Sequence, residues 1–238
     1  MEESDKVFSM FKGKSVALIG PAQNLIGTSK GNYIDSFDIV CRVQNGFIID
    51  KKWEIDYGKR CDVMFNTCNL TTLCSLKRNK DYIKKDCKLI ICPIEKKIYP
   101  DKLDYNISKK NVFENYQDTG IDIPFFKVPD FREPVGLNTG MQSIKFLLTT
   151  EAKSIYIAGY DFHQVADGPN NKCNWHTYLC PIEKIICNIE NCLCKQRKES
   201  PQNTKSSTIG KQAVKNFFKQ NYLYNDRCII DNEIKKLF

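Results

Sequence analysis

The sequence predicts an α/β fold in which a mainly parallel sheet is flanked by helices. Short apolar runs rich in β-forming residues recur along the chain. Several of them are continuous rather than alternating, which is typical of strands covered on both faces. Segments with helical character lie between them, and this alternation favours a doubly wound, Rossmann-like sheet.

The expected elements follow in chain order. The strands are 15–19, 38–43, 61–65, 88–92, 125–128, 154–158 and 228–230, and the clearest helices are 139–150 and 210–220. Because a single hydrophobic core keeps growing until about 250 residues, we expect one domain over residues 1–238. The polar, Cys-rich stretch 166–208 interrupts the alternation, and we expect it to be an insertion or lid that carries an acceptor-binding surface.

Composition limits the classes of function. The net charge of +8 indicates an anionic partner, although lysines spread over the whole chain are also typical of a solvated surface. Nucleic acid is not favoured, because no helix-turn-helix, zinc-finger or RNP motif is present. No apolar run reaches the roughly 18 residues of a membrane span, and the amino terminus lacks a secretory apolar region. We therefore expect a soluble, cytoplasmic protein, with a Golgi-type location left open if the chain is a fragment.

Polar side chains follow the first two expected strands. Gly20 ends the first strand, where the missing side chain would let a ligand approach the backbone. The amides of Gln23 and Asn24 follow it, and Gln44 and Asn45 end the second strand. Such amides bind a base, a ribose or a phosphate, so two neighbouring strand ends would serve one ligand. An ordinary strand-to-helix turn is the alternative interpretation of the first segment.

A second group of polar residues lies around the helix 139–150. Asn138, Thr139 and Gly140 stand at its amino terminus, where free N–H groups and the helix dipole favour a phosphate. A simple helix cap is the alternative for Asn138 and Thr139. Asp161 and His163 follow the strand 154–158, and we expect both to face the same site.

These two groups, taken in order, resemble the long and short motifs of the sialyltransferases, glycosyltransferase family 29. In the long motif a Gly-Asn-Ser-x-Asn-Leu turn precedes Ile-Asp-x-x-Asp-x-Val-x-Arg-x-Asn. The chain matches it at Gly20, Asn24, Leu25, Ile34, Asp35, Asp38, Val40 and Arg42. It carries Pro21 and Gln44 where the family usually has asparagine. The stretches Asn-Thr-Gly-Met and Gly-Tyr-Asp-Phe are similar to the short motif.

The resemblance implies a single catalytic domain with a GT-A-variant fold. Such an enzyme transfers sialic acid from CMP-sialic acid to a glycan hydroxyl with inversion, as in protein glycosylation, and needs no metal or other cofactor. Its partners are the nucleotide-sugar donor and the glycan acceptor. A catalytically inactive nucleotide-sugar-binding protein of the same fold is the alternative. A dinucleotide-dependent oxidoreductase is disfavoured, because Gly-x-Gly-x-x-Gly is missing after the first strand.

The resemblance also implies a histidine base. His176 and Tyr178 look like the family's third motif, close to the leaving phosphate, and His163 is the second candidate. The family places its base shortly before the last amphipathic helix, but residues 203–214 contain no histidine. Three possibilities follow: His176 takes over that role, Lys205 serves instead, or transferase activity has been lost.

Cysteines suggest a competing role for His176. The chain has twelve cysteines and no export signal, so buried thiols or metal ligands are expected rather than disulfides. A zinc site would need four ligands in total, chosen from His176 and the surrounding thiols, although their spacing is irregular. The thiols in question are Cys173, Cys180, Cys187, Cys192 and Cys194. A metal-bound His176 is not available as a base.

Overall fold

The computed structural model describes residues 3–44, 51–66, 76, 80–93, 116–117, 119–128, 139–162 and 203–238. Within these residues, seven strands form one sheet in the order β5-β4-β3-β2-β1-β6-β7, and every neighbouring pair is parallel. The strands are β1 (Ser15–Ile19), β2 (Ile39–Val43), β3 (Val63–Phe65), β4 (Leu89–Cys92), β5 (Phe125–Lys127), β6 (Ser154–Ala158) and β7 (Cys228–Ile230). The predicted Rossmann-like α/β fold is confirmed.

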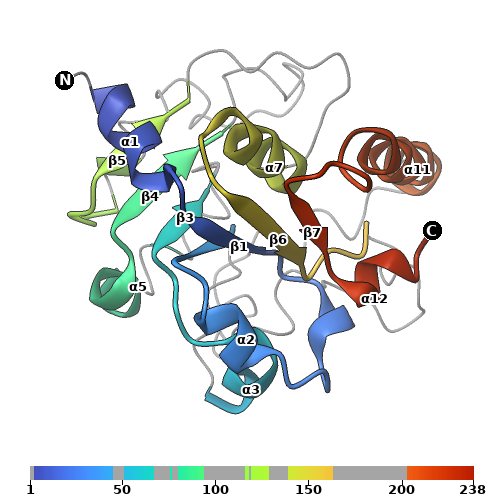
Figure 1. Ribbon diagram of the computed structural model, residues 1–238, viewed down its shortest axis with the longest axis horizontal. Helices are drawn as coiled ribbons and strands as arrows, with labels where there is room; N and C mark the ends of the chain where they lie inside the picture. Colours follow the sequence, from blue (N-terminus) through green and yellow to red (C-terminus); the bar gives the residue numbers. More distant parts are fainter. Residues whose placement is uncertain are drawn as a thin grey trace.

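Helices cover both faces of the sheet (Figure 1). One face carries α1 (Glu3–Phe11), α7 (Thr139–Thr149) and α11 (Asn203–Asn221). The opposite face carries α2 (Gly31–Asp35), α3 (Glu54–Tyr57) and α5 (Lys80–Asp86). The shorter helices are η1 (Gln23–Leu25), η2 (Lys51–Trp53) and α12 (Asn232–Lys235). Among the described residues, no helix combines the length and the apolar character that crossing a membrane requires.

The central strands are buried on both sides, which explains their continuous apolar sequences. Val16 and Leu18 of β1 belong to the core under α7, whereas Ala17 and Ile19 pack on the opposite side with the residues around α2. On the α7 side, Phe146 fills the centre of the core and is fully buried. Burial of a side chain of this size contributes about 1.5–3 kcal/mol to folding. Because such residues lie on both faces of the sheet, the helices on each face contribute to its stability.

The strand order reverses between β1 and β6. The chain first builds outward from β1 to β5 and then returns to the other side of β1 with β6 and β7. In open parallel sheets, ligands bind at such a switch point, beyond the carboxyl ends of the strands. The fold therefore directs attention to the segments that follow β1, β2 and β6.

Helix α11 begins at Asn203, earlier than the expected 210. Residues 203–208, which we assigned to the polar insertion, are therefore part of this helix. The remainder of the insertion lies outside the described residues. The single-domain expectation stays a prediction.

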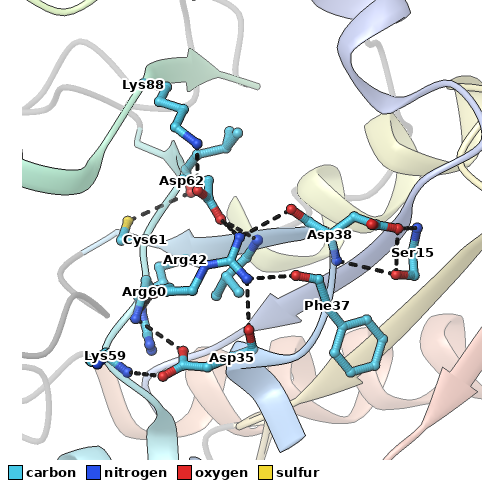
Figure 2. A network of polar contacts seen from close by, with 12 residues as sticks. Ser15, Asp35, Phe37, Asp38, Arg42, Lys59, Arg60, Cys61, Asp62 and Lys88 are labelled. Atoms are coloured by element: carbon cyan, nitrogen blue, oxygen red, sulfur yellow. Dashed lines mark hydrogen bonds and ion pairs between the residues drawn. The ribbon is translucent and has the colours of Figure 1, made fainter. Parts of the chain in front are cut away.

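The amino end of the sheet holds a dense polar network (Figure 2). Asp62, which precedes β3, accepts hydrogen bonds from the backbone N–H of Val40 at 2.9 Å and from Arg60 at 2.7 Å. Lys88 adds an ion pair to the same carboxylate at 3.1 Å. Asp38 accepts hydrogen bonds from the backbone N–H and the hydroxyl of Ser15, which lower its pKa. These side chains fasten the starts of β1 to β4 to one another.

Three polar residues that match the long motif support the backbone in this region. The guanidinium of Arg42 is fully buried and donates to the carbonyl oxygens of Tyr57, Gly58 and Arg60. Asp35 accepts hydrogen bonds from the backbone N–H groups of Lys59 and Arg60. Asp38 accepts hydrogen bonds from Ser15, as described above. Asp35, Asp38 and Arg42 thus stabilise the fold in the chain described here.

Candidate functional site

At the switch point, the backbones of Gly20 and Gly159 pass very close to each other. The N–H of Gly20 donates to Ala158 O and the N–H of Ala22 donates to Gly159 O, both at 2.9 Å. A Cβ atom at Gly20 would lie 2.3 Å from Gly159 O, and a Cβ at Gly159 would lie equally close to Gly20 O. Gly20 is therefore required for the contact with the segment after β6. The sequence analysis had attributed it to ligand approach.

The turn after β1 is fixed to the end of β6. The side-chain amide of Asn24 donates to Tyr160 O at 2.8 Å, across 136 residues of sequence. The hydroxyl of Tyr57 donates to Ala22 O at 2.6 Å and holds the same turn from the α3 side. The other amide atom, Asn24 Oδ1, is buried and has no hydrogen-bond partner among the described residues. Asn24 thus uses its donor for the fold, and its oxygen is left as an acceptor among the described residues.

Gln44 and Thr139 join the second strand end to the start of α7. The amide of Gln44 donates to the hydroxyl oxygen of Thr139 at 2.5 Å, and both side chains are buried. Gln44 has a φ of 54°, in the left-handed region that a non-glycine residue rarely occupies. Strained backbone of this kind concentrates at functional sites. Because the Thr139 hydroxyl accepts here, its own proton can be donated to a bound group.

Two further residues were missed by the sequence analysis. Tyr160 follows Gly159 and is buried, and its hydroxyl has no partner among the described residues. Burial raises the pKa of this phenol well above its ordinary value, so it stays protonated and is a neutral donor. Gln142, in the first turn of α7, is also buried, with Oε1 unpartnered in the described structure. A polar residue between the apolar positions Met141 and Ile144 was the available signal.

Beside β7, at the carboxyl end of the sheet, lies a cluster of polar side chains whose donors and acceptors are paired with one another. Asp231 follows β7 and accepts from Lys30 Nζ at 2.5 Å, from the Tyr156 hydroxyl and from the N–H of Glu233 at 2.9 Å. Burial acts to raise the pKa of Asp231, but these hydrogen bonds outweigh it and the pKa is lowered. The cluster ties the loop before α2 to the C-terminal segment. Since its partners satisfy one another, its role is structural.

The predicted site residues form two separate contacts. Gly20 and Asn24 meet the segment after β6, and Gln44 meets Thr139, with Gly140 buried next to it in α7. Asp161 lies just beyond Tyr160 and is half-buried. The backbone of Gln23 lies in η1 and that of Lys205 in α11, but their side chains are not described. Five predicted site residues fall outside the described residues, namely Asn45, Asn138, His163, His176 and Tyr178.

No group of three or more His, Cys, Asp or Glu side chains that could hold a metal occurs among the described residues. The cysteines considered as zinc ligands, Cys173 to Cys194, lie outside them. What the described part offers is two amide acceptors, Asn24 Oδ1 and Gln142 Oε1, and the hydroxyl donors of Thr139 and Tyr160, which suit a hydroxyl-rich, phosphorylated ligand. In comparisons with known proteins, no family model matches the chain and no curated protein matches its sequence.

Proposed function

We propose that the chain is a glycosyltransferase that binds CMP-sialic acid along the carboxyl ends of β1, β2 and β6. The proposal rests chiefly on one observation, the hydrogen bond between Gln44 and Thr139. It connects the two motif segments on which the family resemblance depends, although they are 95 residues apart. The contact of Asn24 with the backbone of Tyr160 supports the same arrangement from the other side of β1.

The described residues fit the parts of such a donor as follows. The phosphate would lie at the start of α7, where Thr139 supplies a hydroxyl and the positive end of the helix dipole favours an anion. Asn24 Oδ1 would accept from the cytosine amino group or a ribose hydroxyl. The Tyr160 phenol would donate to a nucleotide oxygen. These assignments use the buried polar atoms that the fold leaves without partners.

The reaction would proceed by inversion. A base removes the proton of the acceptor hydroxyl as its oxygen attacks the anomeric carbon and the bond to the CMP oxygen breaks. We assign the base to His176, or else His163, and stabilisation of the departing phosphate to Tyr178 together with the start of α7. No metal step is included in this scheme, and we assign the acceptor-binding surface to the stretch 166–208, as the sequence predicts.

Calorimetric titration with CMP tests the binding site. Asn24→Ala and Thr139→Ala should each weaken CMP binding by about 1–3 kcal/mol, the usual cost of losing one buried hydrogen bond. The matched controls are Asn221→Ala on α11 and Thr149→Ala at the other end of α7, and both should bind CMP as the unaltered chain does. Unchanged affinity in both site variants would reject the proposed site.

A donor-hydrolysis assay then separates the enzyme from a binding protein of the same fold. The second candidate is favoured by one observation, the lack of a histidine in 203–214. If the chain is a transferase, it hydrolyses or transfers the sugar of CMP-sialic acid, and His176→Ala lowers the rate about 10²- to 10⁴-fold while CMP still binds. Tight CMP binding with no turnover in the unaltered chain would instead identify a nucleotide-sugar-binding protein.

A further inference from the structure

Two cysteines lie opposite each other where β3 and β4 begin. The parallel register pairs Val63 with Leu89, and the hydrogen bond from Lys88 N to Asp62 O at 2.8 Å extends the ladder by one residue. The next opposed positions are Cys61 and Cys87. Neighbouring strands are about 4.8 Å apart, and a disulfide joins Cα atoms separated by about 4.4–6.8 Å. The spacing of neighbouring strands thus falls within the range for a disulfide, and the two cysteines lie in the same apolar cluster just before the strands.

The two thiols share one environment. Cys61 is 6% exposed and Cys87 is 7% exposed, and both belong to the apolar cluster with Met64, Ile83 and Ile90. Cys61 lies beside the ion pair of Asp62 and Lys88 (Figure 2). The Cys61 thiol donates to Val63 O at 3.8 Å and the Cys87 thiol to Leu89 O at 3.3 Å. The neighbouring thiol raises the pKa of Cys61 and lowers that of Cys87. Cys87 is thus the easier of the two to deprotonate, and the more reactive thiol.

We propose that Cys61 and Cys87 are a redox modification site that forms a reversible disulfide when a peroxide is present. The Cys87 thiolate attacks hydrogen peroxide, takes one oxygen as a sulfenic acid and, after protonation of the leaving hydroxide, releases water. The sulfur of Cys61 then attacks the Cys87 sulfur, forms the S–S bond and releases a second water. Two thiols and one peroxide thereby give one disulfide and two waters. A dithiol reductant reverses the change.

Register distinguishes this pair from the other buried cysteines of the described residues. Cys41 lies opposite Leu18 and Val63 in its two neighbouring strands, and Cys92 lies opposite Lys127 in β5. Cys41 and Cys92 are fully buried, whereas Cys61 and Cys87 are buried with a small exposed fraction. Cys87 also directly follows α5, a short helix with mostly exposed residues that can open locally.

The site lies at the amino end of the sheet, away from the candidate nucleotide site, and does not depend on the proposed function. The reduced full-length chain is treated with hydrogen peroxide, its remaining thiols are alkylated, and proteolytic peptides are analysed by mass spectrometry. A cross-linked Cys61–Cys87 peptide that dithiothreitol removes is the expected result. Because the link closes a loop across β3 and α5, the melting temperature should rise by about 5 °C and return on reduction.

Variants sharpen the assignment. Cys61→Ser and Cys87→Ser should each abolish both the cross-linked peptide and the reversible rise in melting temperature, while Cys92→Ser should retain both. If a serine variant folds poorly, the peptides of the oxidised, unaltered chain still show whether Cys61 and Cys87 are cross-linked. Recovery of Cys61 and Cys87 as alkylated thiols after oxidation would overturn the proposal. So would a disulfide from either of them to Cys41, or sulfinic acid at Cys87 with Cys61 still reduced.

Discussion

The two ends of the parallel sheet use polar side chains in opposite ways. At the amino end, Asp38 and Asp62 hold Ser15, Arg60, Lys88 and the backbone, so that donors and acceptors satisfy one another. At the carboxyl end around β1 and β6, Asn24 Oδ1 and the Tyr160 hydroxyl are buried with no partner in the described structure. Because buried polar atoms are normally paired, this contrast distinguishes the end that stabilises the fold from the end where we propose that a ligand binds.

Backbone conformation differs in the same way. The glycines with positive φ that precede β1, β3 and β5, namely Gly13, Gly58 and Gly120, adopt this conformation without a side-chain penalty. After β2 and β6 the left-handed residues include Gln44 and Phe162, for which the conformation costs roughly 1–2 kcal/mol each. Two of the three described non-glycine residues with positive φ thus follow the strands where the ligand is proposed to bind, and the third, Ser29, lies in the loop before α2.

Replacement of Arg42 should have the largest effect on stability. Arg42→Met removes the donors to the carbonyl oxygens of Tyr57, Gly58 and Arg60 in a fully buried site. We expect the free energy of unfolding to fall by about 3–5 kcal/mol, measured by urea denaturation. Lys12→Met, which breaks an exposed ion pair with Glu151, is the control and should change it by less than about 1 kcal/mol. An Arg42 variant as stable as that control would contradict the structural role of the guanidinium.

Removal of the Asp62 carboxylate should have the second-largest effect on stability. Asp62→Ala leaves the Val40 N–H and the Arg60 guanidinium without this acceptor, so the free energy of unfolding should fall by about 3 kcal/mol. CMP affinity of the folded variant should stay the same, because the change is at the amino end. Asp86→Ala, at an exposed position of α5, serves as the control. Weaker CMP binding in the Asp62 variant would remove the distinction between the two ends.

Acid should weaken the cluster around Asp231. Its carboxyl has a lowered pKa in the folded chain, so its contribution to stability is complete above the unfolded value of about 3.9 and is lost as pH falls through the folded value. Between about pH 5 and pH 2, the unaltered chain should lose more stability than Asp231→Asn. Thermal unfolding across this range provides the measurement. Parallel pH profiles for the two proteins would show that the carboxylate gains nothing from Lys30 and Tyr156.

The smallest effect on stability is expected at Gln142. Gln142→Met replaces a buried, unpartnered oxygen with an apolar side chain of similar shape, so stability should stay within about 1 kcal/mol of the original or increase. If the oxygen serves the ligand, CMP binding should weaken in the same variant. Denaturation and calorimetry together check both expectations. A clear loss of stability would mean that Gln142 supports the fold, like the residues at the amino end.

The local sequence pattern was sufficient to predict the strands of the sheet. It was not sufficient to predict the polar contacts between their side chains. The seven strands were predicted because burial on both faces gives continuous apolar runs, and errors were limited to end residues such as Asp38 and Lys88, whose side chains bond across strands. The start of α11 was missed because its first turns contain mostly polar residues without an apolar period.

The site could be predicted only where a residue stands at a strand or helix end. Gln44 and Thr139 met that condition, and the structure joins them directly. The link between Tyr156 and Asp231 depends on the pairing of β6 with β7, and the sequence analysis had no means to pair those two side chains. Tyr160 was passed over in favour of Asp161, because whether the hydroxyl of a buried tyrosine has a partner depends on tertiary packing.

The contact between Gly20 and Gly159 restricts which positions of this protein can be substituted. Neither position accepts even a methyl group, since each would collide with the carbonyl of the other. A randomised library covering both positions and selected for folding should return glycine at each. Substitutions meant to alter binding therefore have to be made in the side chains around this contact, while the two glycines stay constant.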